Sequence, residues 1–307
     1  MNRPIIDAHA HMFTRIDGRS GGTTTAAGHL GKIETNGQSA PFLPPANGIT
    51  SFSIAVLEEL MAQSGVEKAL LLQNPTIGTI NEEIEAIVAE KRSKFAGVIQ
   101  VDPLSANACD EIKRFSACKG FRALKLEMGG WGRIYPQISY RDAAMRNIIK
   151  AAGEAGLVIM VDPGPIHSVG HNPQELAALA DEFGDFTFQF EHLGFLEGHN
   201  AADADALKNW NALIDLGLRY NVYLGYSAVG TLLAEEYPCA QSLELLRIAV
   251  ERVGAEKILW GTDVPGTLCD YTYRQMLDNV RLHADFLSDG QRAKIMGENA
   301  ERLYFSS

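Results

Sequence analysis

Short runs rich in β-forming residues alternate with helical segments along nearly the whole chain. The runs lie at 4–11, 66–73, 95–102, 121–128, 157–162, 186–192, 221–226 and 257–263. The segments between them, such as SFSIAVLEELMAQSG and TINEEIEAIVAEKRS, carry apolar residues at helical spacing. Strict alternation with short connections requires parallel strands joined by right-handed crossovers, and about eight such units close into a barrel. The sequence therefore predicts an α/β fold, a (β/α)8 TIM barrel forming a single domain over residues 1–307, with a doubly wound open sheet as the alternative.

The composition favours a small-molecule partner. The formal net charge of −11 argues against nucleic acid or an anionic membrane, because both need clustered Lys and Arg. No apolar run is long enough to span a bilayer, and the start Met-Asn-Arg-Pro leads into the first strand without a secretory pattern, so we expect a cytoplasmic protein. The four cysteines lack Cys-x-x-Cys spacing and are predicted to be reduced thiols. A homodimer formed through the helical faces is left open.

Residues 12–50 depart from this alternation. They are rich in Gly, Thr and Pro and show no apolar period, which predicts a long insertion loop. Because this loop leaves the C-terminal end of the first strand, it would lie on the barrel face where active sites are built, as a lid. A disordered insertion is the alternative.

The first strand, IIDAHAH, is unusually polar for a core element. Strand side chains alternate, so Asp7, His9 and His11 are predicted to face the barrel interior, and Ile6 and Ala8 to pack under the helices. Buried imidazoles need hydrogen bonds or a metal ion, and one ion would satisfy both histidines. The alternative is a pair of hydrogen-bonded core histidines. The pattern makes His9 and His11 candidate metal ligands.

Two later strands end in an aspartate that lies one or two residues before a proline. KILWGTDVP ends the eighth run at Asp263, where Gly261 leaves room beside the carboxylate. GLVIMVDPGP ends the fifth run at Asp162. We predict both as candidate ligands at the barrel mouth, the alternatives being a helix N-cap for Asp263 and a turn residue for Asp162.

The fourth and sixth strands add charged candidates. In FRALKLEMGG, alternation places Lys125 and Glu127 on the inner face, either as a buried ion pair that fills the barrel or as direct participants. In FTFQFEHLG, alternation favours Glu191 over His192 as the inward residue. The polar inner faces of several strands thus converge on one predicted site.

The motifs "DAHAH", "EHLG", "WGTDVP" and "ENAERLY" occur in that order, and the chain resembles the amidohydrolase-2 family of metal-dependent TIM-barrel hydrolases and decarboxylases. The stretches LEELMAQSGVEKALLLQ, KFAGVIQVDPLS and GFRALKLE extend the resemblance over nearly the whole chain except the insertion. It implies one divalent metal ion, usually zinc, bound here by His9, His11 and Asp263. It also selects His192 rather than Glu191 as the residue that polarises the substrate. A bulge at the strand end would reconcile the two.

The chain departs from the family where a strand-five histidine is usual, because Asp162 stands there. A carboxylate in that place lowers the charge of the site by one and favours a harder ion, so manganese is the alternative to zinc. His167 and His171, in the following loop, are alternative ligands or ordinary loop residues. A metal-free site, as the resemblance implies for one lactonase branch, also stays open.

These features predict a metal-dependent hydrolase of a small, carboxylated or cyclic ester, lactone or amide. The ion would lower the pKa of a bound water, Asp263 would accept its proton and His192 would stabilise the oxyanion. The candidate substrate-binding residues are Lys125, Glu127, Arg133 and His167. A non-oxidative decarboxylase on the same site is the first alternative, and a metal-free lactonase or an inactive binding barrel is the second.

Overall fold

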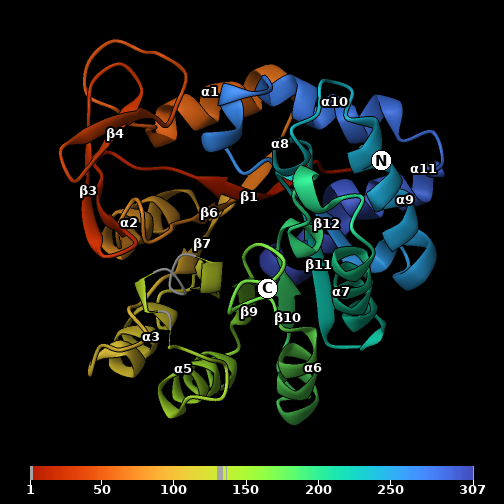
Figure 1. The fold of residues 1–307 in the computed structure, drawn as a ribbon. Coiled ribbons are helices and arrows are strands. Elements are labelled where there is room, and N and C mark those ends of the chain that lie inside the picture. Colours follow the sequence, from red (N-terminus) through yellow and green to blue (C-terminus); the bar gives the residue numbers. More distant parts are fainter. Residues whose placement is uncertain (1–2, 130–133, 136, 307) are drawn as a thin grey trace.

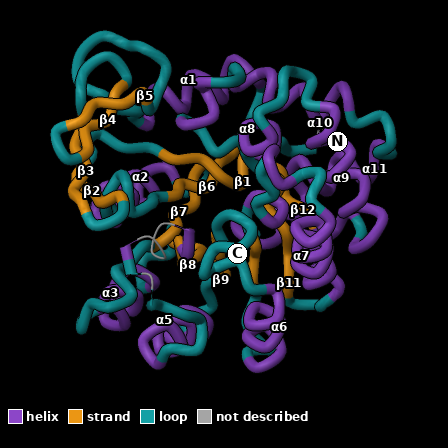
Figure 2. Tube along the Cα trace, in the orientation of Figure 1, coloured by secondary structure: helices purple, strands orange, loops and turns teal. Residues whose placement is uncertain are grey.

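Eight parallel strands form the centre of the computed structural model, which describes residues 3–129, 134–135 and 137–306 (Figures 1 and 2). The strands are β1 (Ile6–His11), β6 (Lys68–Leu72), β7 (Phe95–Ile99), β8 (Phe121–Glu127), β9 (Val158–Asp162), β10 (Phe188–Phe190), β11 (Val222–Tyr226) and β12 (Ile258–Trp260). They pair in chain order. The backbone N–H of Asp263 donates to the His9 carbonyl at 2.7 Å and so links the end of β12 back to β1. The fold is the predicted (β/α)8 barrel, and the open-sheet alternative is wrong.

Helices cover the outside of the strands (Figure 2). They are α1 (Ile54–Ser64), α2 (Asn81–Lys91), α3 (Ala108–Ser116), α5 (Ala143–Glu154), α6 (Pro173–Glu182), α7 (Ala204–Ile214), α8 (Val229–Leu233), α9 (Ala240–Val253), α10 (Tyr273–His283) and α11 (Asp289–Ala293). Local signals set their ends: α10 begins with a capping box of Thr272 and Gln275, and α1 stops at Gly65, whose φ of 75° only glycine adopts without cost. None of the described helices has the length and apolarity needed to cross a membrane.

The barrel interior is apolar at one end and polar at the other. An inner cluster contains small and branched residues from the strands, among them Ile6, Ala8, Leu70, Val98 and Met160. The C-terminal residues Ala300 and Tyr304 pack into the same cluster at the N-terminal ends of the strands. Apolar packing therefore closes this end, and the buried charged side chains lie nearer the C-terminal ends.

The first strand does not follow the predicted alternation. Its pairing with β6 shifts register between Asp7 and Ala10. Ile6 and Ala8 consequently belong to the inner cluster, while the Asp7 carboxylate accepts hydrogen bonds from Thr262 Oγ1 at 2.6 Å and from the hydroxyl of Tyr273 on α10 at 2.9 Å. The prediction that Asp7 faces the interior and that Ile6 and Ala8 pack under the helices is wrong, because an irregularity within the strand changes which face each residue takes.

Residues 12–50 contain a four-stranded antiparallel sheet, so the predicted structureless loop is wrong. The strands are β2 (Asp17–Ser20), β3 (Thr23–Ala27), β4 (Lys32–Thr35) and β5 (Gln38–Pro41). Strands of four or five residues give too short an alternation to stand out, and tight turns at Gly21 and Gly37 join them with positive φ. The sheet packs on the loop after β6 through Arg19 N and the Pro75 carbonyl at 2.7 Å, beside α2 in Figure 1. The lid role stays a prediction.

Candidate active site

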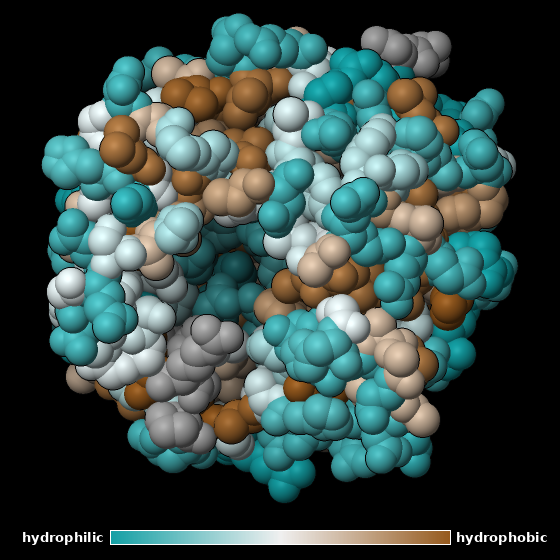
Figure 3. Space-filling model, turned by 45° about the horizontal axis from the view of Figure 1, so that its top comes forward, coloured by the Kyte–Doolittle hydropathy of each residue, from teal (hydrophilic) through white to brown (hydrophobic). Residues whose placement is uncertain are grey.

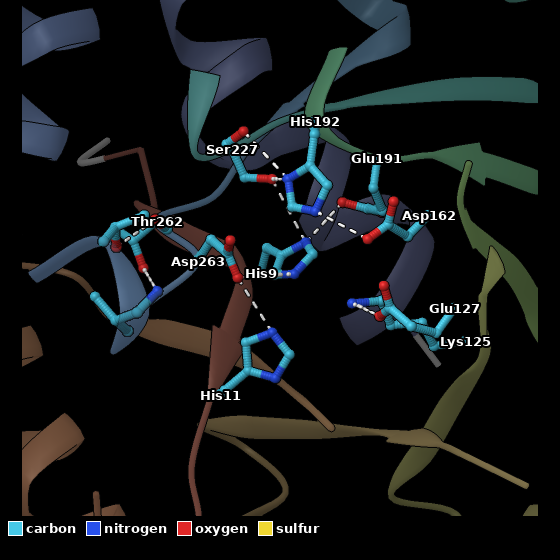
Figure 4. Close-up of polar contacts among 12 residues, drawn as sticks. His9, His11, Lys125, Glu127, Asp162, Glu191, His192, Ser227, Thr262 and Asp263 are labelled. Atoms are coloured by element: carbon cyan, nitrogen blue, oxygen red, sulfur yellow. Dashed lines mark hydrogen bonds and ion pairs between the residues drawn. The ribbon is translucent and has the colours of Figure 1, made fainter. Parts of the chain in front are cut away.

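A hydrophilic hollow opens on one face of the molecule (Figure 3). Buried polar side chains from β1, β8, β9 and the segments after β10 and β12 gather in one region (Figure 4). These positions lie at or just beyond the C-terminal ends of parallel strands, where barrels of this kind place their chemistry.

Two histidines and one aspartate converge at this end of the barrel. Oδ1 of Asp263 lies 3.1 Å from Nε2 of His11 and 3.3 Å from Nε2 of His9. Asp263 follows β12 and has a left-handed φ of 59°, a conformation that costs energy in a residue with a side chain. A Cβ on Gly261 would lie 2.6 Å from the His9 Cβ, so glycine is needed for β12 to approach His9.

Glu191 fixes the orientation of His9. The two side chains are fully buried, and His9 Nδ1 lies 2.7 Å from Glu191 Oε2. A carboxylate only accepts hydrogen bonds, so Nδ1 carries the proton and Nε2 is directed to Asp263. Burial disfavours the charged ring, but the carboxylates of Glu191 and Asp263 outweigh it and raise the pKa of His9 to about 9.

His11 differs from His9 because no carboxylate of the described part of the chain bonds its Nδ1 atom. Its Nδ1 atom is buried without a hydrogen-bond partner among the described residues, and its Nε2 atom faces Asp263. Burial lowers the pKa of His11 to about 4, with Lys125 acting in the same direction and Asp263 opposing it. His11 is therefore a neutral imidazole at physiological pH, which is the state that binds metal ions.

The three side chains fit a divalent ion. One ligand atom from each of His9, His11 and Asp263 can be chosen so that all three lie within 4.8 Å of one another. Among the described residues, His9 Nε2 is buried and makes no well-formed hydrogen bond, so a metal would take the place of the proton that this atom carries at physiological pH. Two imidazoles and a carboxylate form a donor set that suits zinc and neighbouring divalent ions.

Asp162 lies outside that cluster. Within the part of the chain that the structure describes, the group able to hold a metal comprises His9, His11 and Asp263 alone. Asp162 Oδ2 instead lies 3.5 Å from His192 Nε2, and Oδ1 accepts the backbone N–H of Gly164 at 2.8 Å. Its role as a metal ligand stays a prediction.

Lys125 and Glu127 form a buried ion pair beside Asp162. Lys125 Nζ lies 2.8 Å from Glu127 Oε2. Burial alone would lower the pKa of Lys125, but the Glu127 and Asp162 carboxylates outweigh it and raise that pKa above its ordinary value. Burial and the Asp162 carboxylate together raise the pKa of Glu127 well above its usual range. Lys125 therefore stays charged, and its ammonium is already bonded within the barrel.

Glu191 and His192 both reach the site, although they are consecutive. The strand β10 ends at Phe190, and His192 has a left-handed φ of 56°. This turn redirects His192 so that its ring centroid lies 5.0 Å from that of His9 while Glu191 still contacts His9. Alternation predicted Glu191 as the inward residue, and the family resemblance predicted His192. Both side chains lie against His9.

Ser227 is a site residue that the sequence analysis missed. Its hydroxyl lies 3.1 Å from His192 Nδ1 and 3.5 Å from His9 Nδ1. It is buried directly after β11, so its position at the C-terminal end of a strand was the available signal.

The remaining candidates are His167, His171 and Arg133. His167 is exposed in the loop after β9, and Arg133 falls outside the described residues. His171 is buried, with Nε2 2.9 Å from the Gly194 carbonyl, so it links two loops. The substrate-binding roles of Arg133 and His167 stay predictions.

Comparison with known proteins decides the family. A family model described as Amidohydrolase matches residues 6–305. The chain belongs to the amidohydrolase family. It is an enzyme of a family whose members include hydrolases and decarboxylases. A search of curated proteins found no match to this amidohydrolase.

Solved structures share the fold of this amidohydrolase at low sequence identity. A probable 2-pyrone-4,6-dicarboxylic acid hydrolase from Acinetobacter baumannii is 15% identical with a TM-score of 0.72, covering 98% of this chain and 99% of its own. An amidohydrolase from Burkholderia multivorans with bound zinc is 15% identical with a TM-score of 0.72, covering 99% and 100%. The 5-carboxyvanillate decarboxylase from Sphingomonas paucimobilis is 19% identical with a TM-score of 0.63, covering 84% of each chain.

Proposed function

We propose that this amidohydrolase is a metal-dependent hydrolase of a small, carboxylated or cyclic substrate with an ester, lactone or amide bond. The observation that carries the proposal is the convergence of His9 Nε2, His11 Nε2 and the Asp263 carboxylate at the C-terminal end of the barrel. A divalent ion bound there, zinc first and manganese as the alternative, supplies Lewis acidity and lowers the pKa of water toward neutrality.

Asp263 is the proposed general base. Its Oδ1 atom faces both histidines, so Oδ2 is the atom that takes the proton from the attacking water. The Asp263 side chain is 26% exposed, compared with 1% for His9, so water and substrate reach it. The same carboxyl group then delivers the proton to the leaving oxygen or nitrogen as the bond to the carbonyl carbon breaks.

His192 is the proposed group that stabilises the oxyanion. Its ring is held by Ser227 on the Nδ1 side and faces Asp162 on the Nε2 side, and it packs against the ring of His9. A donor fixed in this way costs little reorganisation when negative charge develops on the carbonyl oxygen. Lys125 adds positive potential to the same region.

The ionisation of the site favours hydrolysis over decarboxylation. Asp162 and Asp263 both have pKa values held well below the usual range, so both are ionised at physiological pH. Asp263 is ionised and solvent-accessible, so it can take a proton from water, whereas a decarboxylase needs a group that delivers a proton to the substrate carbon. Hydrolysis is therefore the better supported reaction, and the decarboxylase is the alternative.

The test is a substrate panel in heavy-oxygen water with and without chelator. We expect label in the acid product from one or more lactones, esters or amides, with loss of turnover on chelation and recovery on adding zinc or manganese. Release of carbon dioxide from a carboxylate without label would instead establish the decarboxylase. Chelator-resistant lactone opening would identify a metal-free lactonase, and ligand binding without turnover would identify a binding barrel.

A further inference from the structure

A chain of buried hydrogen bonds runs from the C-terminal segment to His9. The Tyr304 hydroxyl lies 2.5 Å from Gln189 Oε1, and Gln189 Nε2 lies 2.6 Å from Glu191 Oε1. The other Glu191 oxygen, Oε2, lies 2.7 Å from His9 Nδ1. Each of the four side chains is at most 1% exposed, so water does not replace any of these contacts.

The chemistry of the donors and acceptors gives this chain one direction. Glu191 only accepts, so the amide nitrogen of Gln189 must face it and the amide oxygen must face Tyr304. Tyr304 then has to donate, and burial raises its pKa well above the ordinary value, which keeps the proton on the hydroxyl. Both Glu191 oxygens are thereby occupied, one by Gln189 and one by His9.

Steric limits hold the Glu191 carboxylate in the same place. A Cβ on Gly225 of the neighbouring strand β11 would lie 2.5 Å from Glu191 Oε2, so only glycine leaves room for it. Tyr304 itself is fixed in the inner apolar cluster, and the adjacent Phe305 packs under the Lys68 ammonium, 4.9 Å from the ring centroid. This chain of hydrogen bonds is therefore held at both ends by rigid parts of the fold.

We propose that Tyr304 and Gln189 are positioning residues that set the affinity of the His9, His11 and Asp263 site for a divalent ion. They act through Glu191, which orients His9 so that Nε2 faces the ligand cluster. The inference rests on the metal site of the proposed function. By this inference, the C-terminal segment at the closed end of the barrel affects metal affinity at the open end.

The expected effects decrease with distance along the chain. Glu191→Gln should weaken zinc affinity by about 10- to 100-fold, which is usual for the partner of a metal-bound histidine. Tyr304→Phe removes one hydroxyl and keeps the ring, so we expect weakening of about threefold to tenfold. Gln189→Met, which leaves Glu191 Oε1 without a partner, should fall between the two. Tyr223→Phe is the matched control, because Tyr223 packs against the same inner cluster and, among the described residues, is not a member of the hydrogen-bonded chain.

The experiment is a competition titration of zinc between each full-length variant and a chromophoric chelator. The melting temperature of each metal-free variant is measured in parallel. A purely structural role for Tyr304 would lower the melting temperature without changing the zinc affinity. The Glu191→Gln/Tyr304→Phe double variant supplies the decisive comparison, because Tyr304→Phe should have no further effect on zinc once Glu191 is neutralised.

Weaker zinc binding by Tyr304→Phe, unchanged binding by Tyr223→Phe and non-additivity in the double variant would support the inference. If the wild-type protein binds zinc and Tyr304→Phe does not change the affinity, the inference would be overturned and the proposed function would stand. An additive double variant would also overturn it, since the effect would not pass through Glu191. Absence of zinc binding by the wild-type protein would overturn both proposals.

Discussion

The two sides of the barrel mouth use similar residues in opposite ways. The ligand side consists of His9, His11 and Asp263, and the ion-pair side consists of Lys125, Glu127 and Asp162 (Figure 4). On the ligand side, nitrogen atoms of both histidines are buried without a well-formed hydrogen bond to any described residue. On the ion-pair side, the Lys125 ammonium lies 2.8 Å from Glu127 Oε2, although that oxygen also makes no well-formed hydrogen bond to a described residue. The ligand side therefore leaves buried imidazole nitrogens for an external group, whereas the charged groups of the ion-pair side face one another within the protein.

This difference assigns the reaction to the ligand side and the surrounding electrostatic potential to the ion-pair side. Groups that lack protein partners are available to an ion and a substrate, as the exposed quarter of the Asp263 side chain indicates. Groups that neutralise one another fix the electrostatic potential in which the reaction takes place. Substitutions on the ligand side should therefore change activity most, and substitutions on the ion-pair side should change stability most.

The largest expected effect is that of Asp263→Asn. Removing the proposed base should lower kcat by about 10²- to 10⁴-fold. The measurement is steady-state hydrolysis of the best lactone or ester from the panel, with zinc content determined on the same sample. The same exchange at Asp142, the N-cap of α5 outside the site, provides the matched control, and Asp142→Asn should leave kcat unchanged. An Asp263→Asn enzyme that kept more than about a tenth of wild-type turnover would place the base elsewhere.

Lys125→Met should have its main effect on stability. It leaves Glu127 and Asp162 buried without their ammonium partner, and removing one partner of a buried pair costs about 3–5 kcal/mol. Urea unfolding of the metal-free protein measures the loss. The Lys125→Met/Glu127→Gln double variant should recover part of it, because a neutral amide replaces one of the two buried acidic groups. No recovery would mean that the pair does not act as a unit.

The two histidines predict the pH dependence of metal affinity. Metal binding must displace the proton from His9, whose pKa in the metal-free protein is raised to about 9. The pKa of His11 is lowered to about 4, so His11 has no proton to lose above about pH 5. Zinc affinity should accordingly rise by about tenfold per pH unit between about pH 6 and 8 and level off above about pH 9. Chelator competition at several pH values gives the slope, and a two-proton slope would contradict this difference between the histidines.

Asp162→Asn should have the smallest effect on the metal. Asp162 lies outside the ligand cluster and contacts His192. Removing the bonded partner of a metal ligand usually weakens metal affinity by about 10- to 100-fold, and we expect Asp162→Asn to change zinc affinity by less than that. The hydrolytic rate should fall, because His192 loses a neighbouring charge. A large drop in zinc affinity would move Asp162 from the ion-pair side to the ligand side and restore it as the fourth ligand.

The barrel and the main polar positions could be predicted from the sequence because they depend on local periodicity. All eight predicted strands are present, and Lys125 and Glu127 lie on the inner face as alternation requires. Alternation failed where the backbone departs from regular strand geometry, at the register shift after Asp7 and at the left-handed turn of His192. Such local departures are set by tertiary contacts that a single strand does not encode.

The partners of the site residues were harder to predict than the residues themselves. Ser227 and Tyr304 reach the site through contacts 35 and 115 residues away in sequence, with His192 and Gln189 respectively. Ser227 follows a predicted strand and Tyr304 ends the motif ENAERLY, but neither pattern indicates which residue each side chain contacts. The small sheet of residues 12–50 was missed because its strands are too short for a periodic signal.

The measurement that tests the account most directly is the metal content of the purified protein, compared with a His9→Ala/His11→Ala variant of the same chain. The account predicts about one divalent ion per wild-type chain and essentially none in the variant, with both proteins folded by circular dichroism. Equal metal content in the two proteins, or none in the wild type after incubation with zinc and manganese, would contradict it.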